Sequence, residues 1–346
     1  MTLYTRAHDG FDTSIENLCC VGLNYTSDAD RGLGVLGAIS GVLAAILCII
    51  EITFIFDNAI INARVLKTLS PFWQQLFLTV GILIAVFGMR LVFPIAIVAA
   101  TTSLDWQQVL NLALNDSESY AKALEGATPL ITAFGGSFLL MLGLHFFFDW
   151  QRTVTWLSIE KPLLRLRSNW LPAVITLLVL IGLVIVPEHP DPRGALISGI
   201  AGLLTYLIVH GLSSAVGHSK ALNNAAPKIG LAAFWTFLYL EVLDASFSFD
   251  GVIGAFAITS DVVIIAAGLG VGAFWVRSLT IYMVRKKVLD QYKYLEHGAH
   301  YTILILSIIM LVSVFAHLPE VVPGILGISV IAASIYASLK RSRREV

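Results

Sequence analysis

The sequence is dominated by apolar stretches that are long enough to cross a lipid bilayer as helices, with short polar or charged segments between them. A bilayer core of about 30 Å needs about 20 apolar residues of helix. Because lipid offers no hydrogen-bond partners, a backbone inside it must satisfy its own polar groups, as a helix does. We therefore predict an all-α polytopic membrane helix bundle of about nine spans, at residues 33–62, 77–100, 129–148, 171–186, 194–215, 229–258, 262–284, 300–318 and 321–339.

The composition excludes a soluble protein of this length. Hydrophobic residues make up 57% of the chain and charged residues only 13%, whereas soluble domains carry about 25% charged residues. The net charge of -1 gives no reason to expect nucleic acid as a partner, so membrane lipid is the expected surrounding. No Ser/His/Asp or Cys/His nucleophile arrangement is recognisable, and we expect neither an enzyme nor a permanently bound cofactor. The oligomeric state and the role of Cys19 and Cys20 stay open.

The basic residues indicate the orientation of the chain. With nine spans, the N-terminus and the C-terminus lie on opposite sides of the membrane. Four Lys and Arg residues then fall on the N-terminal side, sixteen fall on the C-terminal side, and Arg90 and Arg277 lie inside spans. Positive charge favours the cytoplasmic side. We therefore expect a multi-pass protein of the cell (inner) membrane with its N-terminus outside and its C-terminus in the cytoplasm.

Five acidic residues lie inside predicted spans: Glu51 and Asp57 in the first, and Glu241, Asp244 and Asp250 in the sixth. An ionised acid near the bilayer centre costs about 2.5–3.5 kcal/mol on insertion scales. Because five such residues would cost as much as the whole stability of a domain, they must be paired, protonated or bound to a ligand. A structural cluster of paired charges is the competing interpretation, and it does not predict that the acids fall into two matching groups.

The two groups of acids belong to an internal repeat. Residues 51–57 read Glu-Ile-Thr-Phe-Ile-Phe-Asp and residues 244–250 read Asp-Ala-Ser-Phe-Ser-Phe-Asp, so acidic and aromatic residues share their offsets. An odd number of crossings separates the two spans, which makes the repeat inverted, with spans 1–3 in one half and spans 6–8 in the other. The expected segments are a polar N-terminal segment (1–31), the first repeat (32–148), an amphipathic connector with two spans (149–228), the second repeat (229–318) and a last span with a basic tail (319–346).

The spacing of the acids predicts that the first and sixth helices are broken. Residues six apart on a straight helix differ by about 240° in direction, so Asp244 and Asp250 would not share a face. Asn58 and Gly251 follow the last acid of each motif, and both residue types tolerate irregular backbone. A break would also free backbone carbonyls as ligands and bring both motifs together near the midplane.

The oxygen-rich side chains predict a midplane site for a divalent metal cation. Carboxylates, amides and hydroxyls are hard ligands that suit Mn²⁺, Ca²⁺ or Mg²⁺. Arg90 and Arg277 lie at matching places in the two halves, where each would balance one carboxylate. His145 and His300, near the cytoplasmic ends of spans, are candidates for a proton relay. The predicted metal ligands are Glu51, Asp57, Asn58, Glu241, Asp244, Ser248 and Asp250.

At these residues the chain resembles the TerC family of membrane proteins, a branch of the LysE-like transporter superfamily. TerC-like proteins carry an acid six residues before Asp-Asn, as Glu51 stands before Asp57 and Asn58. They also carry Glu-x-x-Asp followed by aromatic-Ser-x-Asp, as residues 241–250 do. Over residues 40–340 the chain most closely resembles an uncharacterised bacterial membrane-protein branch, domain-of-unknown-function family 475. The resemblance implies a two-repeat membrane fold and, in characterised relatives, manganese export or metal homeostasis.

Three functions are compatible with these features. The first is a secondary transporter that exports a divalent cation, with Mn²⁺ favoured over Ca²⁺, so that the metal ion is cargo and not a cofactor. The second is an exporter of a small organic cation or an amino acid, whose ammonium group the same carboxylates would bind. The third is a non-transporting membrane scaffold in stress response, which would bind peripheral proteins through the basic segments 152–167 and 285–293.

Overall fold

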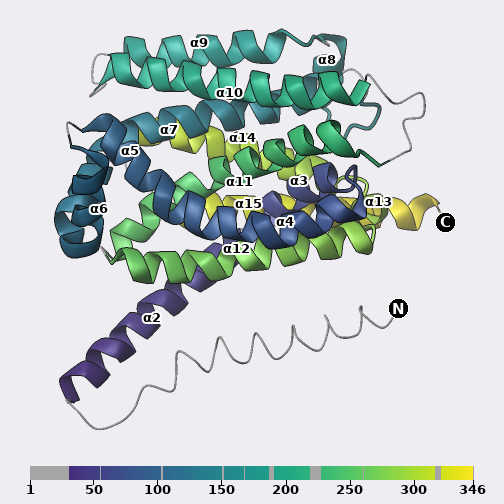
Figure 1. Cartoon of the computed structure of the whole chain (residues 1–346). Helices are drawn as coiled ribbons and strands as arrows, with labels where there is room; N and C mark the ends of the chain where they lie inside the picture. Colours follow the sequence, from purple (N-terminus) through teal and green to yellow (C-terminus); the bar gives the residue numbers. More distant parts are fainter. Residues whose placement is uncertain are drawn as a thin grey trace.

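The computed structural model describes residues 31–54, 56–102, 104–149, 152–166, 168–186, 191–218, 227–259, 261–315 and 321–345. The polar N-terminal segment, with Cys19 and Cys20, therefore lies outside the described residues. Within the described ranges the chain forms helices and no β-strand, which confirms the predicted all-α class (Figure 1). The main helices are α2 (Arg31–Phe54), α3 (Phe56–Leu66), α4 (Pro71–Leu83), η1 (Ile84–Val92), α5 (Phe93–Thr101), α6 (Trp106–Asn115), α7 (Ser117–Phe148), α9 (Leu171–Ile185), α10 (Pro192–His218), α11 (Gly230–Ile258), α12 (Val262–Arg285), α14 (Leu295–Ser313) and α15 (Val321–Glu345).

Seven helical segments in the described part of the chain are long and apolar enough to cross a membrane. They are Pro71–Thr101, Ser117–Phe148, Pro192–Ser214, Gly230–Ser248, Val263–Arg285, Leu295–Ser313 and Val322–Arg343. Two shorter apolar helices, Ser40–Ile49 and Leu171–Ile185, fall in the first and fourth predicted spans. Each predicted span thus overlaps one of these segments, and the prediction of a polytopic membrane helix bundle is confirmed.

Helix α7 lies at the centre of the bundle. It packs against both α10 and α14, and Figure 1 shows α9 and α10 along the side of the bundle beyond it. Glycines permit this close packing: a Cβ on Gly143 of α7 would lie 2.5 Å from Leu304 of α14. On the other side of the bundle, α12 packs against α2 and α3, so the first and seventh predicted spans are in contact.

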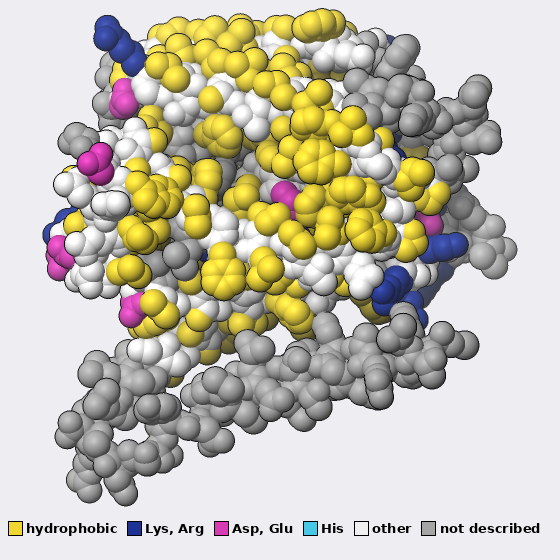
Figure 2. Space-filling view, in the orientation of Figure 1, with side chains coloured by type: hydrophobic (Ala, Val, Ile, Leu, Met, Phe, Trp, Pro, Cys, Tyr) yellow, Lys and Arg dark blue, Asp and Glu magenta, His cyan; other side chains and the backbone are white. Residues whose placement is uncertain are grey.

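The outer surface is apolar, as a bilayer requires. Figure 2 shows hydrophobic side chains over most of the face in view, whereas most basic and acidic side chains lie toward its two ends and one acidic group is visible near the middle. On the outer helices α9 and α10, large aliphatic side chains such as Leu178 and Ile197 are exposed. Lipid tails would cover such side chains in the membrane, which is why an apolar exterior is stable there.

The structure tests the predicted break in the sixth helix. In the first predicted span the described helices are α2, up to Phe54, and α3, from Phe56, and the predicted break of that span falls on residue 55, which lies outside the described residues. The sixth is one continuous helix, α11, which passes through the second acidic motif without interruption. The prediction of a broken sixth helix was therefore wrong. A break is not needed to compensate Glu241 and Asp244, because residues three apart share a helix face and one arginine reaches both.

The predicted amphipathic helix in the connector is also absent from the described residues of that segment. Residues 152–166 contain only the short helix α8 (Glu160–Leu163) and the 3₁₀ turn η2 (Leu164–Leu166). The carboxylate of Glu160 accepts hydrogen bonds from the backbone N–H groups of Trp156 and Leu157, which favours a turn over a long helix. The segment folds back onto the bundle, where Trp156 packs against Tyr301 of α14.

Candidate functional site

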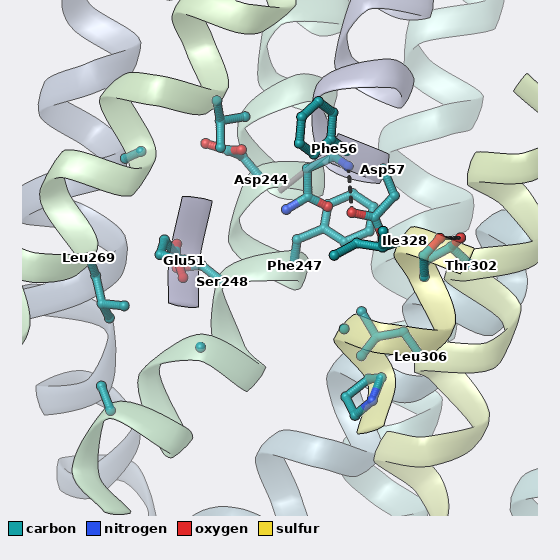
Figure 3. Close-up of a pocket in the computed structure, with 18 of the residues that line it drawn as sticks. Glu51, Phe56, Asp57, Asp244, Phe247, Ser248, Leu269, Thr302, Leu306 and Ile328 are labelled. Carbon is teal, nitrogen blue, oxygen red and sulfur yellow. Dashed lines mark hydrogen bonds between the residues drawn. The ribbon is translucent and has the colours of Figure 1, made fainter. Parts of the chain in front are cut away.

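A cavity of about 90 Å³ lies between α2, α3, α11, α12, α14 and α15 (Figure 3). In this view Glu51 and Asp244 lie to the left and Asp57 and Thr302 to the right, with Phe247 and Ser248 between them. A volume of this size holds several water molecules. Six of the residues predicted for the site line the cavity, namely Glu51, Asp57, Asn58, Arg90, Asp244 and Ser248. The structure thus brings the two acidic motifs to one cavity, as the repeat predicted.

Asp57 belongs to α3. Its side chain is buried, and its Oδ1 accepts a hydrogen bond of 3.0 Å from the backbone N–H of Asn58. A backbone N–H donor stabilises an ionised carboxylate, so this hydrogen bond compensates part of its charge. In the part of the chain that the structure describes, no basic side chain lies within 4 Å of this carboxylate. Asp57 is therefore available to a cation in the cavity.

Glu51 of α2 forms an ion pair with Arg90 of η1. Arg90 Nη2 donates to Glu51 Oε1 at 2.6 Å, and Arg90 Nη1 donates to the carbonyl oxygen of Ala85 at 3.1 Å. Arg90 lies in a π-helix of nine residues within the second predicted span. Such segments are rare and are frequently found at functional sites. The sixth span, where a helix break was predicted, is a regular helix, and the irregular backbone of the described residues here is the π-helix in the second span.

Arg277 of α12 joins two acids of α11 behind the cavity. Its Nη2 donates to Glu241 Oε2 at 2.9 Å and to Asp244 Oδ2 at 2.8 Å, and its Nη1 donates to Glu241 Oε1 at 3.1 Å. In both halves of the repeat, the first acid of the motif therefore pairs with the arginine of the next span, as Glu51 does with Arg90. Glu241 and Arg277 do not line the cavity themselves, so Glu241 lies apart from the other predicted metal ligands.

Asn62 connects the two motifs directly. It lies one helical turn after Asn58 in α3, its side chain is fully buried, and its Nδ2 donates to Asp244 Oδ1 at 3.3 Å. The sequence reasoning missed this residue. The signal that could have found it is the spacing of four, which places both asparagines on one face of α3.

Several buried oxygen atoms around the cavity have no hydrogen-bond partner among the described residues. They are Asn58 Oδ1, Asn62 Oδ1 and Ser248 Oγ, and such atoms are normally satisfied by protein, water or an ion. No three His, Cys, Asp or Glu side chains of the described residues stand together as a metal-binding group. Asp250 is a predicted ligand whose backbone lies in α11, but its side chain lies outside the described residues.

The two predicted proton-relay histidines lie away from the cavity lining. His145 of α7 packs against His210 of α10 with tilted rings, whose centroids are 4.5 Å apart. His300 of α14 stacks on Phe146 at 3.7 Å, and its Nδ1 lies 2.7 Å from the carbonyl oxygen of Glu296. Both histidines therefore pack between helices, and their role in proton transfer stays a prediction.

The structure also shows a buried charge cluster that the sequence reasoning missed. The carboxylate of Glu160 is fully buried and lies 3.1 Å from Arg152 Nη2 and 3.5 Å from His297 Nε2. It also accepts a hydrogen bond of 3.0 Å from the hydroxyl of Tyr301. Burial lowers the pKa of Arg152, and the adjacent carboxylate opposes that shift. This cluster attaches the connector to α14 and takes no part in the cavity.

The last span contributes to the cavity as well, although it lies outside both predicted repeats. Pro323, Gly324, Gly327 and Ile328 of α15 line one side of the cavity. Close approach explains the small residues, since a Cβ on Gly327 would lie 2.8 Å from Thr302 of α14. The sequence analysis did not predict this part of the cavity lining, because it considered polar residues and these four residues are apolar or glycine.

Comparisons with known proteins identify a family. The family model described as "Protein of unknown function (DUF475)" matches residues 56–345. No curated protein and no solved structure matches the chain.

Proposed function

The chain belongs to the family of proteins of unknown function DUF475, and we propose that it is a secondary transporter that exports a divalent metal cation across the cell (inner) membrane. The observation that carries this proposal is the position of Asp57. It is a buried carboxylate on a cavity inside a membrane bundle, with no basic partner among the described residues. An intramembrane acid of this kind is typically functional.

The charge balance supports a divalent ion. The intramembrane acids whose side chains the structure describes are Glu51, Asp57, Glu241 and Asp244, and two arginines, Arg90 and Arg277, pair with them. If all four acids are ionised, two negative charges remain, which one divalent cation would balance. A monovalent ammonium group would leave one charge uncompensated in a low-dielectric environment.

The chemistry of the cavity supports a hard cation. Carboxylate oxygens, the unsatisfied Oδ1 of Asn58 and the unsatisfied Oγ of Ser248 are available there. Such oxygen ligands suit Mn²⁺, Ca²⁺ or Mg²⁺. The proposed ligands are Asp57, Asn58 and Ser248, with Glu51, Asp244 and Asp250 as further candidates. The resemblance of the two motifs to TerC proteins favours Mn²⁺ and favours export.

The experiment that tests this proposal measures Mn²⁺ transport by the purified protein in liposomes that contain a Mn²⁺-sensitive dye. The variant is Asp57→Asn, which removes the charge and keeps the shape of the side chain. We expect wild-type protein to transport Mn²⁺ and the variant to lose at least about 90% of the rate, since an intramembrane carboxylate is a primary ligand for a hard cation. Ca²⁺ and Mg²⁺ are added as competitors to rank the ions.

Asp105→Asn is the matched control. It makes the same chemical change at the N-cap of α6, outside the cavity, where asparagine caps a helix as well as aspartate does. Transport of Mn²⁺ by a correctly folded Asp57→Asn variant at the wild-type rate would overturn the proposal. Transport of amino acids without transport of divalent ions would select the organic-cation exporter. Full activity of Asp57→Asn in cells, with loss of function after charge reversal in segments 152–167 and 285–293, would select the scaffold.

A further inference from the structure

The two arginines at matching places in the repeat are held very differently. Arg277 pairs with Asp244 and Arg90 with Glu51, the first acids of the two motifs, which suggests equivalent roles from the sequence alone. The hydrogen bonds of each guanidinium, the exposure of its partner and the access to the cavity distinguish them.

Arg277 is fixed from all sides. Its side chain is fully buried, and it makes four hydrogen bonds to the carbonyl oxygen of Phe77 and to the carboxylates of Glu241 and Asp244. Its guanidinium lies 4.1 Å from the centroid of the Phe77 ring. Gly81 leaves no free space beside it, since a Cβ there would overlap Arg277 Nη1. Moving this side chain would break contacts with two acids at once.

Arg90 is held by fewer contacts and lies on the cavity. Its guanidinium makes one bond to a carboxylate and one to a backbone carbonyl in its own helix. Its Nε has no partner among the described residues. The carboxylate that it binds, Glu51, also lines the cavity and is 13% exposed. A cation in the cavity therefore has direct access to the pair.

Glu51 packs closely against two glycines. A Cβ on Gly251 of α11 would lie 2.9 Å from Glu51 Oε2, and a Cβ on Gly272 of α12 would overlap Glu51 Cγ. The side chain thus occupies space that exists only because both residues are glycine. Since Glu51 fits this space and Arg90 is held by only two hydrogen bonds, we take the arginine as the partner that moves when the ion pair opens.

We propose that Arg90 is a tethered cation that competes with the cargo: it holds Glu51 while no cargo is bound and releases this carboxylate to an entering divalent cation. The proposal rests on the proposed function. A divalent ion attracts a carboxylate with twice the charge of a guanidinium at equal distance, and Asp57 on the same cavity adds to this attraction. On release of the cargo, Arg90 returns to Glu51, which lowers the affinity of the site. Arg277 stays bound throughout.

The test measures the Kd of Mn²⁺ for the purified full-length protein by calorimetry. In Arg90→Gln the competitor is absent, and we expect Mn²⁺ to bind about tenfold more tightly, a typical coupling between linked ligands. Transport should become slower, because the ion is released less readily. In Arg90→Lys the charge is kept but the two-nitrogen fork is lost, and we expect binding about threefold tighter. This second variant keeps the test valid if Arg90→Gln does not fold.

Two controls make the result specific. Glu51→Gln combined with Arg90→Gln should lose most of the gain in affinity, because the released carboxylate is then missing. Lys122→Gln removes an exposed basic residue outside the cavity and should leave the Kd unchanged. Binding of Mn²⁺ to folded Arg90→Gln and Arg90→Lys with the wild-type Kd, or more weakly, overturns the tethered cation. The two proposals fail in different ways. If only the tethered cation is wrong, wild-type protein still binds Mn²⁺; if wild-type protein does not bind Mn²⁺, the proposed function itself is wrong.

Discussion

Asp57 and Glu241 are both buried carboxylates inside spans, yet their surroundings differ. Glu241 receives two hydrogen bonds from Arg277, so it is compensated by the protein itself. Asp57 receives a backbone hydrogen bond and faces the cavity. A buried charge must be compensated. Glu241, which the protein itself compensates, therefore stabilises the fold, whereas Asp57 is suited to bind a cation from outside. Acidic side chains in one bundle thus serve different purposes.

We predict that Arg277→Leu lowers the free energy of unfolding of the bundle by about 3–5 kcal/mol, because removal of the guanidinium leaves the buried carboxylates of Glu241 and Asp244 uncompensated. The measurement is the free energy of unfolding in detergent by denaturant titration. Lys122→Leu removes the basic partner of an exposed pair with Glu118 and should not change stability measurably. If the two variants unfold alike, Arg277 is not a structural anchor.

Among the helices, close packing depends on small residues at a few crossings. Gly202 of α10 faces α7, where a Cβ would overlap the carbonyl oxygen of Phe134 and Ser137 Oγ. Ser137 Oγ in turn donates to the carbonyl oxygen of Gly199 at 2.7 Å. Interfaces of membrane helices typically combine small residues with such hydrogen bonds. The contact joins the central helix to the outer layer formed by α9 and α10.

At the scale of this helix pair, Gly202→Ala should destabilise the protein by about 1–3 kcal/mol, as overpacking of a close contact does. A backbone carbonyl cannot move aside as a flexible side chain would. Gly211→Ala is the control on the same helix, because no atom lies within 4 Å of the position that its added methyl group would take. The free energy of unfolding in detergent measures both variants, and an equal effect of the two would contradict the packing argument.

The molecule is a helix bundle whose basic side chains lie toward two ends in the view of Figure 2. Basic residues are concentrated in the segments between particular spans, with sixteen on one side and four on the other if the chain crosses nine times. The cytoplasmic side of a membrane attracts such charge. This asymmetry supports the proposed orientation with the N-terminus outside.

For the whole molecule we predict opposite labelling of two introduced cysteines. In a background with Cys19, Cys20 and Cys48 replaced by serine, Glu118→Cys should react with a membrane-impermeant maleimide in intact cells. Arg343→Cys should react only after the membrane is permeabilised, because positive segments stay in the cytoplasm. Both side chains are exposed. The reverse pattern would invert the proposed orientation.

The sequence alone predicted the spans, the all-α class and six of the polar residues that line the cavity. Hydrophobicity is a property of each segment by itself, so the spans could be found without knowledge of their neighbours. The cost of a charge in lipid is equally local, which is why Glu51, Asp57, Asp244, Arg90 and Arg277 could each be recognised as candidate functional residues.

Only the tertiary structure decided how these residues are paired and which backbone is irregular. Arg277 on a neighbouring helix compensates Glu241 and Asp244 while α11 stays continuous, and the burial of Glu160 depends on contacts with α14. The wall that α15 adds to the cavity likewise depends on its packing against α14. Each of these features is determined by side chains that are distant in the sequence, and their positions are set only when the helices pack.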